Sequence, residues 1–217
     1  MSGGVGREPS GEAARDPAAP YTVPSLVEVA ARVFNERGYD ATSMEDLSRA
    51  AGISKSSFYH HVSGKEALLR GALERALDGL FGILTEPAAT AGSPLERLRH
   101  IVRRQVEVLA AELPSVTLLL RVRGNTDTER WALGRRRVFD QAVAELVREA
   151  VAAGEVAGEV AGEADGGAVD PTVAARLLSG TVNSLVDWYR PGRIAVPDLV
   201  ATVERAAFDG LRGPRRD

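Results

Sequence analysis

Apolar residues recur every three or four positions along most of the chain, which is the period of an α-helix. The first helix is predicted to begin near Pro24 and to end at Gly38. Its buried stripe contains Leu26, Val29, Ala30, Val33 and Phe34. No segment alternates apolar and polar residues between hairpin turns, as a half-buried strand would. The pattern therefore predicts an all-α protein of about nine helices.

Residues 42–69 predict two short helices joined by a tight turn. Thr42 and Ser43 can each cap this helix, and Thr42 and Glu45 have the spacing of a capping box. Met44, Leu47 and Ala51 then give one apolar face. Gly52 stands where this helix must stop, because glycine adopts a positive φ without steric penalty. Two short helices around such a turn have the geometry of a helix-turn-helix.

The second short helix is predicted to follow Ser54 as its cap. Phe58 and Val62 would point inward, whereas the outward side chains would be Lys55, Ser56, Tyr59 and His60. Ser63 and Glu66 form a second capping-box pattern, which predicts a long helix reaching about Leu84.

Caps and prolines mark further helices along the remaining chain. Residues 86–92 read as a loop, and Ser93, Pro94 and Glu96 together open the next helix. Its buried stripe would be Leu98, Ile101, Val102, Gln105, Val108 and Leu109. Later helices are predicted over residues 114–122, 126–153, 171–189 and 197–212.

These elements divide the chain into a small and a larger unit. Residues 1–20 are poor in apolar side chains and read as a disordered tail. Residues 21–68 form the helix-turn-helix unit, and residues 69–212 form the helical remainder, followed by a tail at 213–217. Within the larger unit, the Gly-Glu-Val-Ala repeats of residues 153–168 read as a flexible loop, because glycine every four residues disfavours a helix.

Charge placement suggests what the helix-turn-helix binds. From Leu47 to Lys65 the chain carries three cations, Arg49, Lys55 and Lys65, and no acidic residue. Cations, hydroxyls and an aromatic ring on one short helix suit the DNA major groove, where side chains meet base edges and phosphates.

The run VEVAARVFNERGYDATSMEDLSRAAGISKSSFYHHVSGKEALL, residues 27–69, closely resembles the DNA-binding domain of the TetR family of transcriptional regulators. Gly64 departs from the serine that the family often has there. The later string Trp188-Tyr189-Arg190-Pro191-Gly192 is similar to the C-terminal domain of some actinobacterial TetR-like repressors of lipid or sterol breakdown. The resemblance implies a homodimer through the last two helices and a ligand pocket in the C-terminal domain. Ligand binding would then change the distance between the two DNA-binding domains of the dimer.

The DNA contacts are assigned to one short segment. Thr42, Ser43, Tyr59 and Lys65 are expected to hold phosphates, and Lys55, Ser56, Ser57 and His60 to face the major groove. His60 and His61 point about 100° apart on a helix. We therefore expect a DNA contact and a packing residue rather than a metal site.

The arginines at 121, 123, 130, 135, 136 and 137 are only partly offset by Asp127 and Glu129. One reading is a solvated face with ion pairs, and the other is a site for an anionic, amphipathic effector such as an acyl-CoA or a lipid-derived acid. For Trp188, a position in an interface or in the core is the alternative to a ligand contact. The candidate ligand residues are Arg104, Arg121, Trp131, Asn183 and Trp188.

Composition removes several other functions. The 217 residues carry a net charge of −3 and no cysteine, so disulfides and thiolate sites are absent. There is no apolar run long enough for a membrane span and no signal-peptide core, so the expected location is the cytoplasm. No phosphate loop, nucleophile elbow or metal-ligand spacing indicates an enzyme, a metal or a cofactor.

The sequence therefore predicts a repressor that binds palindromic duplex DNA and leaves it when an effector binds. An activator, or a regulator without a small ligand, is the alternative among DNA-binding proteins. A small-molecule carrier, which would not bind DNA sequence-specifically, is the alternative outside that class.

Overall fold

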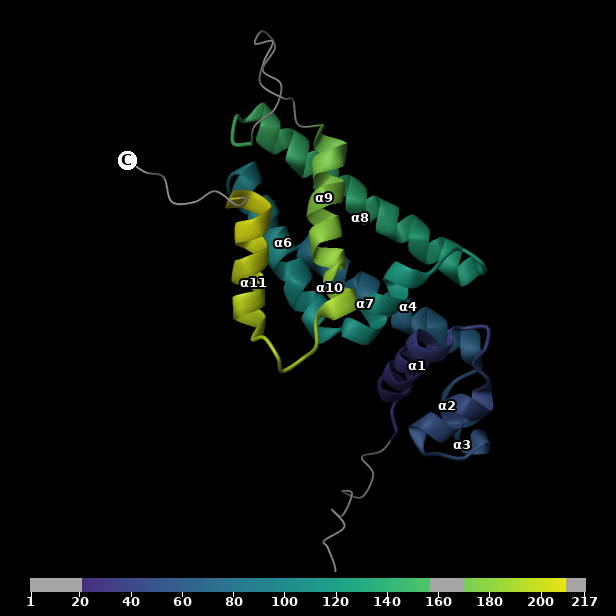
Figure 1. The fold of residues 1–217 in the computed structure, drawn as a ribbon. Coiled ribbons are helices and arrows are strands. Elements are labelled where there is room, and N and C mark those ends of the chain that lie inside the picture. The colour runs from purple at the N-terminus through teal and green to yellow at the C-terminus, as the bar shows by residue number, and fades with distance from the viewer. Residues whose placement is uncertain (1–20, 157–169, 210–217) are drawn as a thin grey trace, which may run out of the picture.

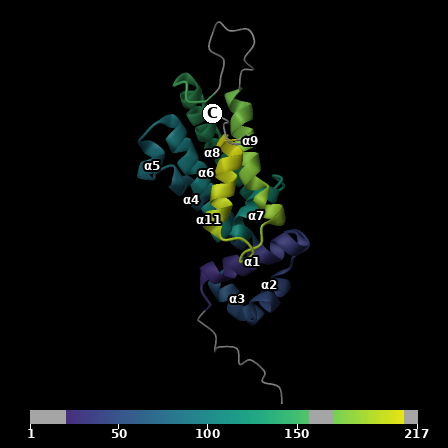
Figure 2. The same cartoon turned by 60° about the vertical axis from the view of Figure 1, so that its left-hand side comes forward.

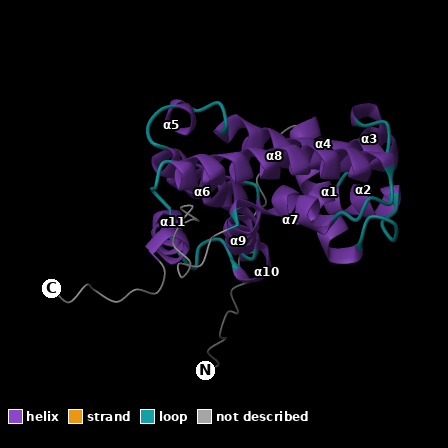
Figure 3. Cartoon of the chain, turned by 90° about the horizontal axis from the view of Figure 1, so that it is seen from above, coloured by secondary structure: helices purple, strands orange, loops and turns teal. Residues whose placement is uncertain are grey.

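The computed structural model describes residues 21–156 and 170–209, which are helical and contain no strand. The all-α prediction is confirmed for this part of the chain. Figure 3 shows an elongated body with the small N-terminal helices at one end and α5, α6 and α11 at the other. The predicted tails and most of the predicted loop at 153–168 lie outside the described residues.

Helices α1 (Val23–Arg37), α2 (Met44–Ala51) and α3 (Lys55–His61) form the small end of the molecule. Figure 2 shows them together below the larger body. Leu26, Leu47 and Phe58, one from each helix, are fully buried and hold the unit together. Gly52 ends α2 with φ 74°, the left-handed conformation that the turn requires and that glycine adopts at low cost.

Two of the predicted capping boxes are wrong in detail. Ser43, not Thr42, caps α2, and its partner is Asp46 rather than Glu45. The long helix α4 (Lys65–Ile83) begins after Gly64 without a side-chain cap. Glu66 instead accepts a hydrogen bond from Thr128, 2.8 Å away on a distant helix. The Glu66 carboxylate thus makes a tertiary contact, whereas the local pattern predicted that it would cap its own helix.

Helix α4 continues from the small unit into the body, so the predicted boundary at residue 68 falls inside one helix. A short helix α5 (Pro87–Thr90) occupies the predicted loop 86–92. Helix α6 (Pro94–Ala111) has the predicted Ser93–Glu96 capping box, and all six residues of its predicted stripe are buried. Helices α7 (Leu113–Arg121) and α8 (Asp127–Ala152) follow, and Thr126, the predicted first residue of the latter helix, caps α8.

The C-terminal helices lie across α6 and α8 (Figure 1). Residues 171–189, predicted as one helix, form α9 (Pro171–Asn183) and a short α10 (Leu185–Trp188), separated at Ser184. Helix α11 (Val196–Glu204) packs on α6 and continues as one wider turn, Arg205–Asp209. Among the described helices, none is both long and apolar enough to cross a lipid bilayer.

Candidate DNA-binding face and effector groove

Helix α3 presents a polar outer face and an apolar inner face. Lys55, Ser56, Tyr59 and His60 are exposed, and Tyr59 keeps 47% of its surface accessible. Phe58 is fully buried on the opposite side. The four exposed residues were all assigned to DNA, and the helix displays them together as a groove-reading helix requires.

The start of α3 is fixed by its own serines. The hydroxyl of Ser54 accepts the backbone N–H of Ser57 at 3.1 Å and lies 3.1 Å from the hydroxyl of Ser56. Ser57 is half-buried, so its side chain has a less open position than those of Lys55 and Ser56. This cap orients the first turn of α3.

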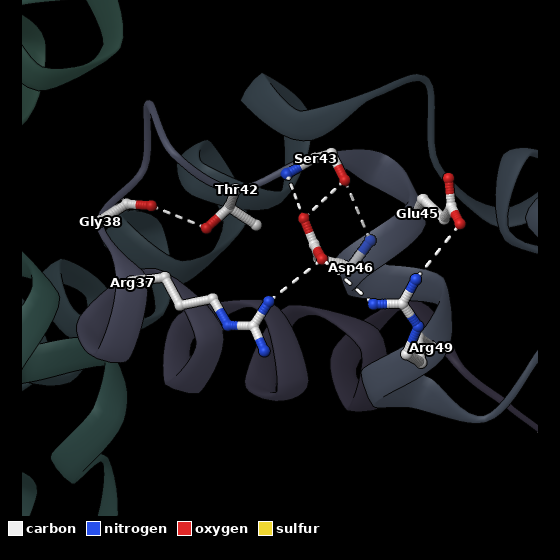
Figure 4. A network of polar contacts seen from close by, with 7 residues as sticks. All are labelled: Arg37, Gly38, Thr42, Ser43, Glu45, Asp46 and Arg49. Atoms are coloured by element: carbon white, nitrogen blue, oxygen red, sulfur yellow. Dashed lines mark hydrogen bonds and ion pairs between the residues drawn. The ribbon is translucent and has the colours of Figure 1, made fainter.

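The two residues before α2 have their side-chain donors occupied (Figure 4). Thr42 is 2% exposed, and its hydroxyl donates to the carbonyl oxygen of Gly38 at 2.7 Å. The Ser43 hydroxyl donates to Asp46 at 2.6 Å while accepting the Asp46 backbone N–H. The structure therefore corrects the assignment of Thr42 to phosphate, because its side chain is buried and bonded inside the protein. The Ser43 hydroxyl would have to leave Asp46 to donate to a phosphate.

Two arginines that were not assigned to DNA stand beside this cap. Arg37 and Arg49 lie 3.1 Å and 3.4 Å from Asp46, and Arg49 also pairs with Glu45 at 3.2 Å. Both arginine side chains are more than half exposed. Hydrogen bonds from Ser43, helped by these cations, hold the pKa of Asp46 below its ordinary value. Arg37 comes from the end of α1, and no local motif at that position pointed to it.

Lys65 is tied to the loop that precedes α2. Its ammonium donates to the carbonyl oxygen of Tyr39 at 2.8 Å and lies 4.3 Å from the centre of the Tyr39 ring. An ammonium has three donors, so N–H groups remain for a phosphate oxygen. The contact with Tyr39 restricts where this charge can be placed.

A groove of about 490 Å³ lies between α8 and α9 in the body. This volume is within the range of small-molecule sites. Arg136 and Arg137 of α8 and Arg176 of α9 line it. In residues 21–156 and 170–209, no carboxylate lies within 4.0 Å of these three guanidinium groups. The groove therefore offers positive charge that the described protein does not neutralise by close pairing.

A narrow inner recess adjoins the groove and shares Arg136, Asp140, Ser179 and Asn183 with it. Its free space is about 30 Å³. Most of its wall is apolar, with residues from α4, α6, α7, α8 and α9: Leu80, Leu109, Val116, Leu119, Leu120, Phe139 and Val182. An apolar interior next to a cationic mouth suits an amphipathic anion.

Asp140 stands where the groove meets the recess. Burial raises the pKa of its carboxyl group, although Arg136 and Arg176 act in the opposite direction. A carboxylate in this place limits the net positive charge of the groove, so Asp140 affects how strongly an anion binds.

The predicted ligand residues do not form one site. Asn183 lines the groove and the recess, but Arg104 pairs with Glu86 and Glu107 outside them. Arg121 points to the small unit and donates to Asn35. The ring of Trp131 is covered by Arg70 at 3.3 Å, and Trp188 is 52% exposed. The five-residue prediction is corrected because helices separated in sequence turn these side chains in different directions.

The arginines of residues 121–137 fall into two groups. Some make contacts within the protein, and others line the groove where an anionic effector could bind. Arg130 pairs with Asp127, and Arg135 covers the Phe81 ring at 4.0 Å, whereas Arg136 and Arg137 face the groove. Arg176 joins them from the second turn of α9. Sequence reasoning missed Arg176 because a lone arginine near a helix start has no distinguishing pattern.

Comparison with known proteins agrees with this arrangement. Residues 26–72 match the family described as bacterial regulatory proteins of the tetR family, and residues 91–211 match the family described as the tetracyclin repressor-like C-terminal domain. These two matches cover most of the chain. The protein belongs to the TetR family.

Relatives support the assignment over the full length of the fold. The HTH-type transcriptional repressor KstR2 of Rhodococcus jostii (strain RHA1) is 31% identical over 87% of this chain and 90% of its own. The crystal structure of SCO3833, a TetR-family member from Streptomyces coelicolor A3, is 55% identical, covers 92% of this chain and 94% of its own, and has a TM-score of 0.78. The TetR-family regulator PfmR of Thermus thermophilus is 25% identical over 87% of this chain and 99% of its own, with a TM-score of 0.71. The predicted helix-turn-helix unit followed by a helical ligand-binding domain is thus confirmed for this TetR-family chain.

Proposed function

We propose that this TetR-family regulator is a homodimeric repressor that binds a palindromic operator and leaves it when an anionic, amphipathic effector enters the groove between α8 and α9. The observation that carries the proposal is the group of Arg136, Arg137 and Arg176 at the mouth of an apolar recess. Repression, rather than activation, is supported by the likeness to KstR2 repressors. The transcriptional output distinguishes these two alternatives.

The DNA end of the proposal rests on α3. Its exposed Lys55, Ser56, Tyr59 and His60 face outward from a rigid unit whose inner face is packed by Phe58. In a symmetric dimer, two such helices must be about 34 Å apart, or a multiple of that distance, to enter successive major grooves. A two-fold protein then reads a palindromic site.

The dimer surface is proposed on α9 and α10, together with the loop that precedes α11. Four of the seven large apolar residues exposed in the described part of the chain lie here: Val173, Leu177, Trp188 and Ile194. A cluster of this kind is typical of a protein interface. Leu185, which lies in the same C-terminal segment, is 1% exposed and belongs to the core of its own subunit.

An occupant of the recess would act on the DNA end through α7. This helix lines the recess with Val116, Leu119 and Leu120, and its opposite side packs on α1. A ligand that fits one placement of α7 better than another changes the population of the two states. A small rotation of each DNA-binding unit would then change the distance between the two α3 helices, so that they no longer fit successive major grooves.

The proposal is tested in two steps. First, selection from a random duplex pool should yield a palindrome bound at least about a thousandfold tighter than non-specific DNA. Second, fatty acids, their CoA thioesters and uncharged alkyl alcohols are titrated into the protein–DNA complex. We expect release by the anionic compounds and not by the alcohols.

The variant Arg136→Met should weaken release by anions, whereas Arg148→Met on the exposed side of α8 is the matched control. Failure to select any preferred sequence would contradict the DNA-binding proposal. Equal release by neutral and anionic compounds, with Arg136→Met behaving as wild type, would contradict the anionic effector.

A further inference from the structure

Gln105 of α6 carries a polar side chain into the inner recess and is 6% exposed. Its amide makes no hydrogen bond to any residue that the structure describes. Among the described residues, Asn35 Oδ1 is the only enclosed side-chain polar atom without a partner, so the Gln105 amide remains open to the recess. Its hydrogen-bonding groups are therefore available to a molecule that enters the recess.

Three other polar side chains meet the same recess. Asp140 of α8 and Ser179 and Asn183 of α9 line it, and within the described residues their side chains have no hydrogen bond or close ion pair. The rest of the wall is largely apolar. Hydrogen-bonding capacity is therefore concentrated at one point of an otherwise hydrophobic site, which is how small-molecule sites fix orientation.

We propose that the recess binds a hydroxyl group carried on the apolar part of the effector, and that Gln105 is the residue that selects it. This inference rests on the effector groove proposed above. The free space of about 30 Å³ admits a small polar group such as a hydroxyl. A hydroxyl oxygen accepts from the amide N–H of Gln105 or Asn183 and donates to the carboxylate of Asp140.

Other terminal groups fit the same residues less well. A methyl group would displace water from the amides and the carboxylate without replacing its hydrogen bonds. A second carboxylate would meet Asp140 and be repelled unless one of the two were protonated. The anionic end of the effector is accordingly expected at the arginines of the groove, with the hydroxyl at the opposite, inner end.

The first test compares matched probes that differ in one oxygen atom. Decanoic acid and its ω-hydroxy derivative, together with the CoA thioesters of both, are titrated into the dimer and into the protein–DNA complex. We expect the hydroxylated member of each pair to bind about tenfold more tightly in the wild type, since a hydrogen bond to a buried polar group is of this size. Gln105→Met, which keeps the length of the side chain, should remove this preference.

The second test needs no ligand. Gln105→Met should leave the melting temperature within about 2 °C of the wild-type value, because the amide is open to the recess and makes no hydrogen bond to a described residue. The control is Glu36→Met, which places methionine at an exposed position of α1 outside the groove and the recess. It should leave the melting temperature unchanged and keep the preference for the hydroxylated probe.

Each outcome decides a different part of the argument. A melting temperature of Gln105→Met that is lower by more than about 4 °C would show that the amide is bonded within the free protein, and would overturn the inference. Equal binding of plain and hydroxylated probes would also overturn it, while the effector groove would stand. If no probe binds while operator binding is intact, the anionic effector and the hydroxyl site both fail.

Discussion

The side-chain amide of Asn35 donates a hydrogen bond to the carbonyl oxygen of Pro114 at 2.7 Å, which joins the end of α1 to the first turn of α7. At the other end of α7, the Arg121 guanidinium donates to the backbone oxygen of Asn35 at 3.3 Å. One residue of the DNA-binding unit thus holds both ends of the helix that lines the recess. We infer that Asn35 positions the DNA-binding unit relative to the effector site.

Asn35→Ala should weaken the response to effector without preventing either binding step. The variant loses a hydrogen bond, but it also removes the buried Asn35 Oδ1, which has no partner in the described structure, so we expect a change in stability below about 1 kcal/mol. The effector concentration for half-maximal DNA release should rise several-fold, while direct effector binding stays near the wild-type value. The exposed neighbour Glu36→Ala is the control. Equal release curves for all three proteins would argue against the positioning role.

Lys55 and Lys65 should contribute to DNA affinity in different ways. Lys55 is exposed on α3, so Lys55→Ala should weaken binding and also relax the preference for particular bases. Lys65→Ala should weaken binding to all sequences alike and reduce the salt dependence by about one phosphate contact. Gel-shift titrations at several salt concentrations measure both effects.

The control for Lys65 is Tyr39→Phe. This change keeps the ring and the backbone oxygen that hold the ammonium. Operator binding by Tyr39→Phe should therefore resemble that of the wild type. If Lys65→Ala alters base preference as strongly as Lys55→Ala, the assignment of Lys65 to phosphate is wrong.

Leu177 and Leu185 should respond differently to the same substitution. Leu177 is 67% exposed, so Leu177→Glu should give a folded monomer whose operator affinity falls at least about tenfold, because a single head makes half of the contacts. Leu185 is 1% exposed, and Leu185→Glu should fail to fold because it buries an unpaired charge. Sedimentation and circular dichroism separate the two outcomes. A Leu177→Glu protein that remains dimeric would remove this face from the interface.

Asp140 should make the protein less stable as the pH rises. Burial raises the folded-state pKa of Asp140 above its ordinary value of 3.8, so the folded state holds this proton more tightly than the unfolded state does. Stability is then lost as the pH rises from the ordinary pKa through the folded-state pKa. Asp140→Asn should be more stable than the wild type above this window and show no gain below it.

Urea unfolding across the acidic range measures this difference. The effect should be modest, because a carboxylate that is only partly buried is screened by solvent. Asp78→Asn, at an exposed aspartate of α4, should not change the pH profile in this way. An Asp140→Asn protein that parallels the wild type at every pH would contradict the assigned effect of burial.

The sequence by itself determined the elements whose causes are local. The cap formed by Ser93, the turn at Gly52 and the inward Phe58 each follow from residues within a few positions, and the structure has all three. Helical periodicity likewise predicted six of the seven buried residues of α6 and omitted Val106. Such features depend on backbone hydrogen bonds and on one helix face, both of which can be read from spacing.

Only the tertiary structure decided which side chains share a site. Glu66 bonds to Thr128 and does not cap its own helix. Arg104 pairs with Glu86 and does not line the pocket expected for it. Arg136 and Arg176, from two different helices, line the same groove. In the folded chain Leu185 is buried and Leu177 is exposed, although both belong to one predicted helix. The physical reason is that the rotation and crossing of packed helices depend on all their neighbours together, and the sequence spacing of one helix carries no information about these partners.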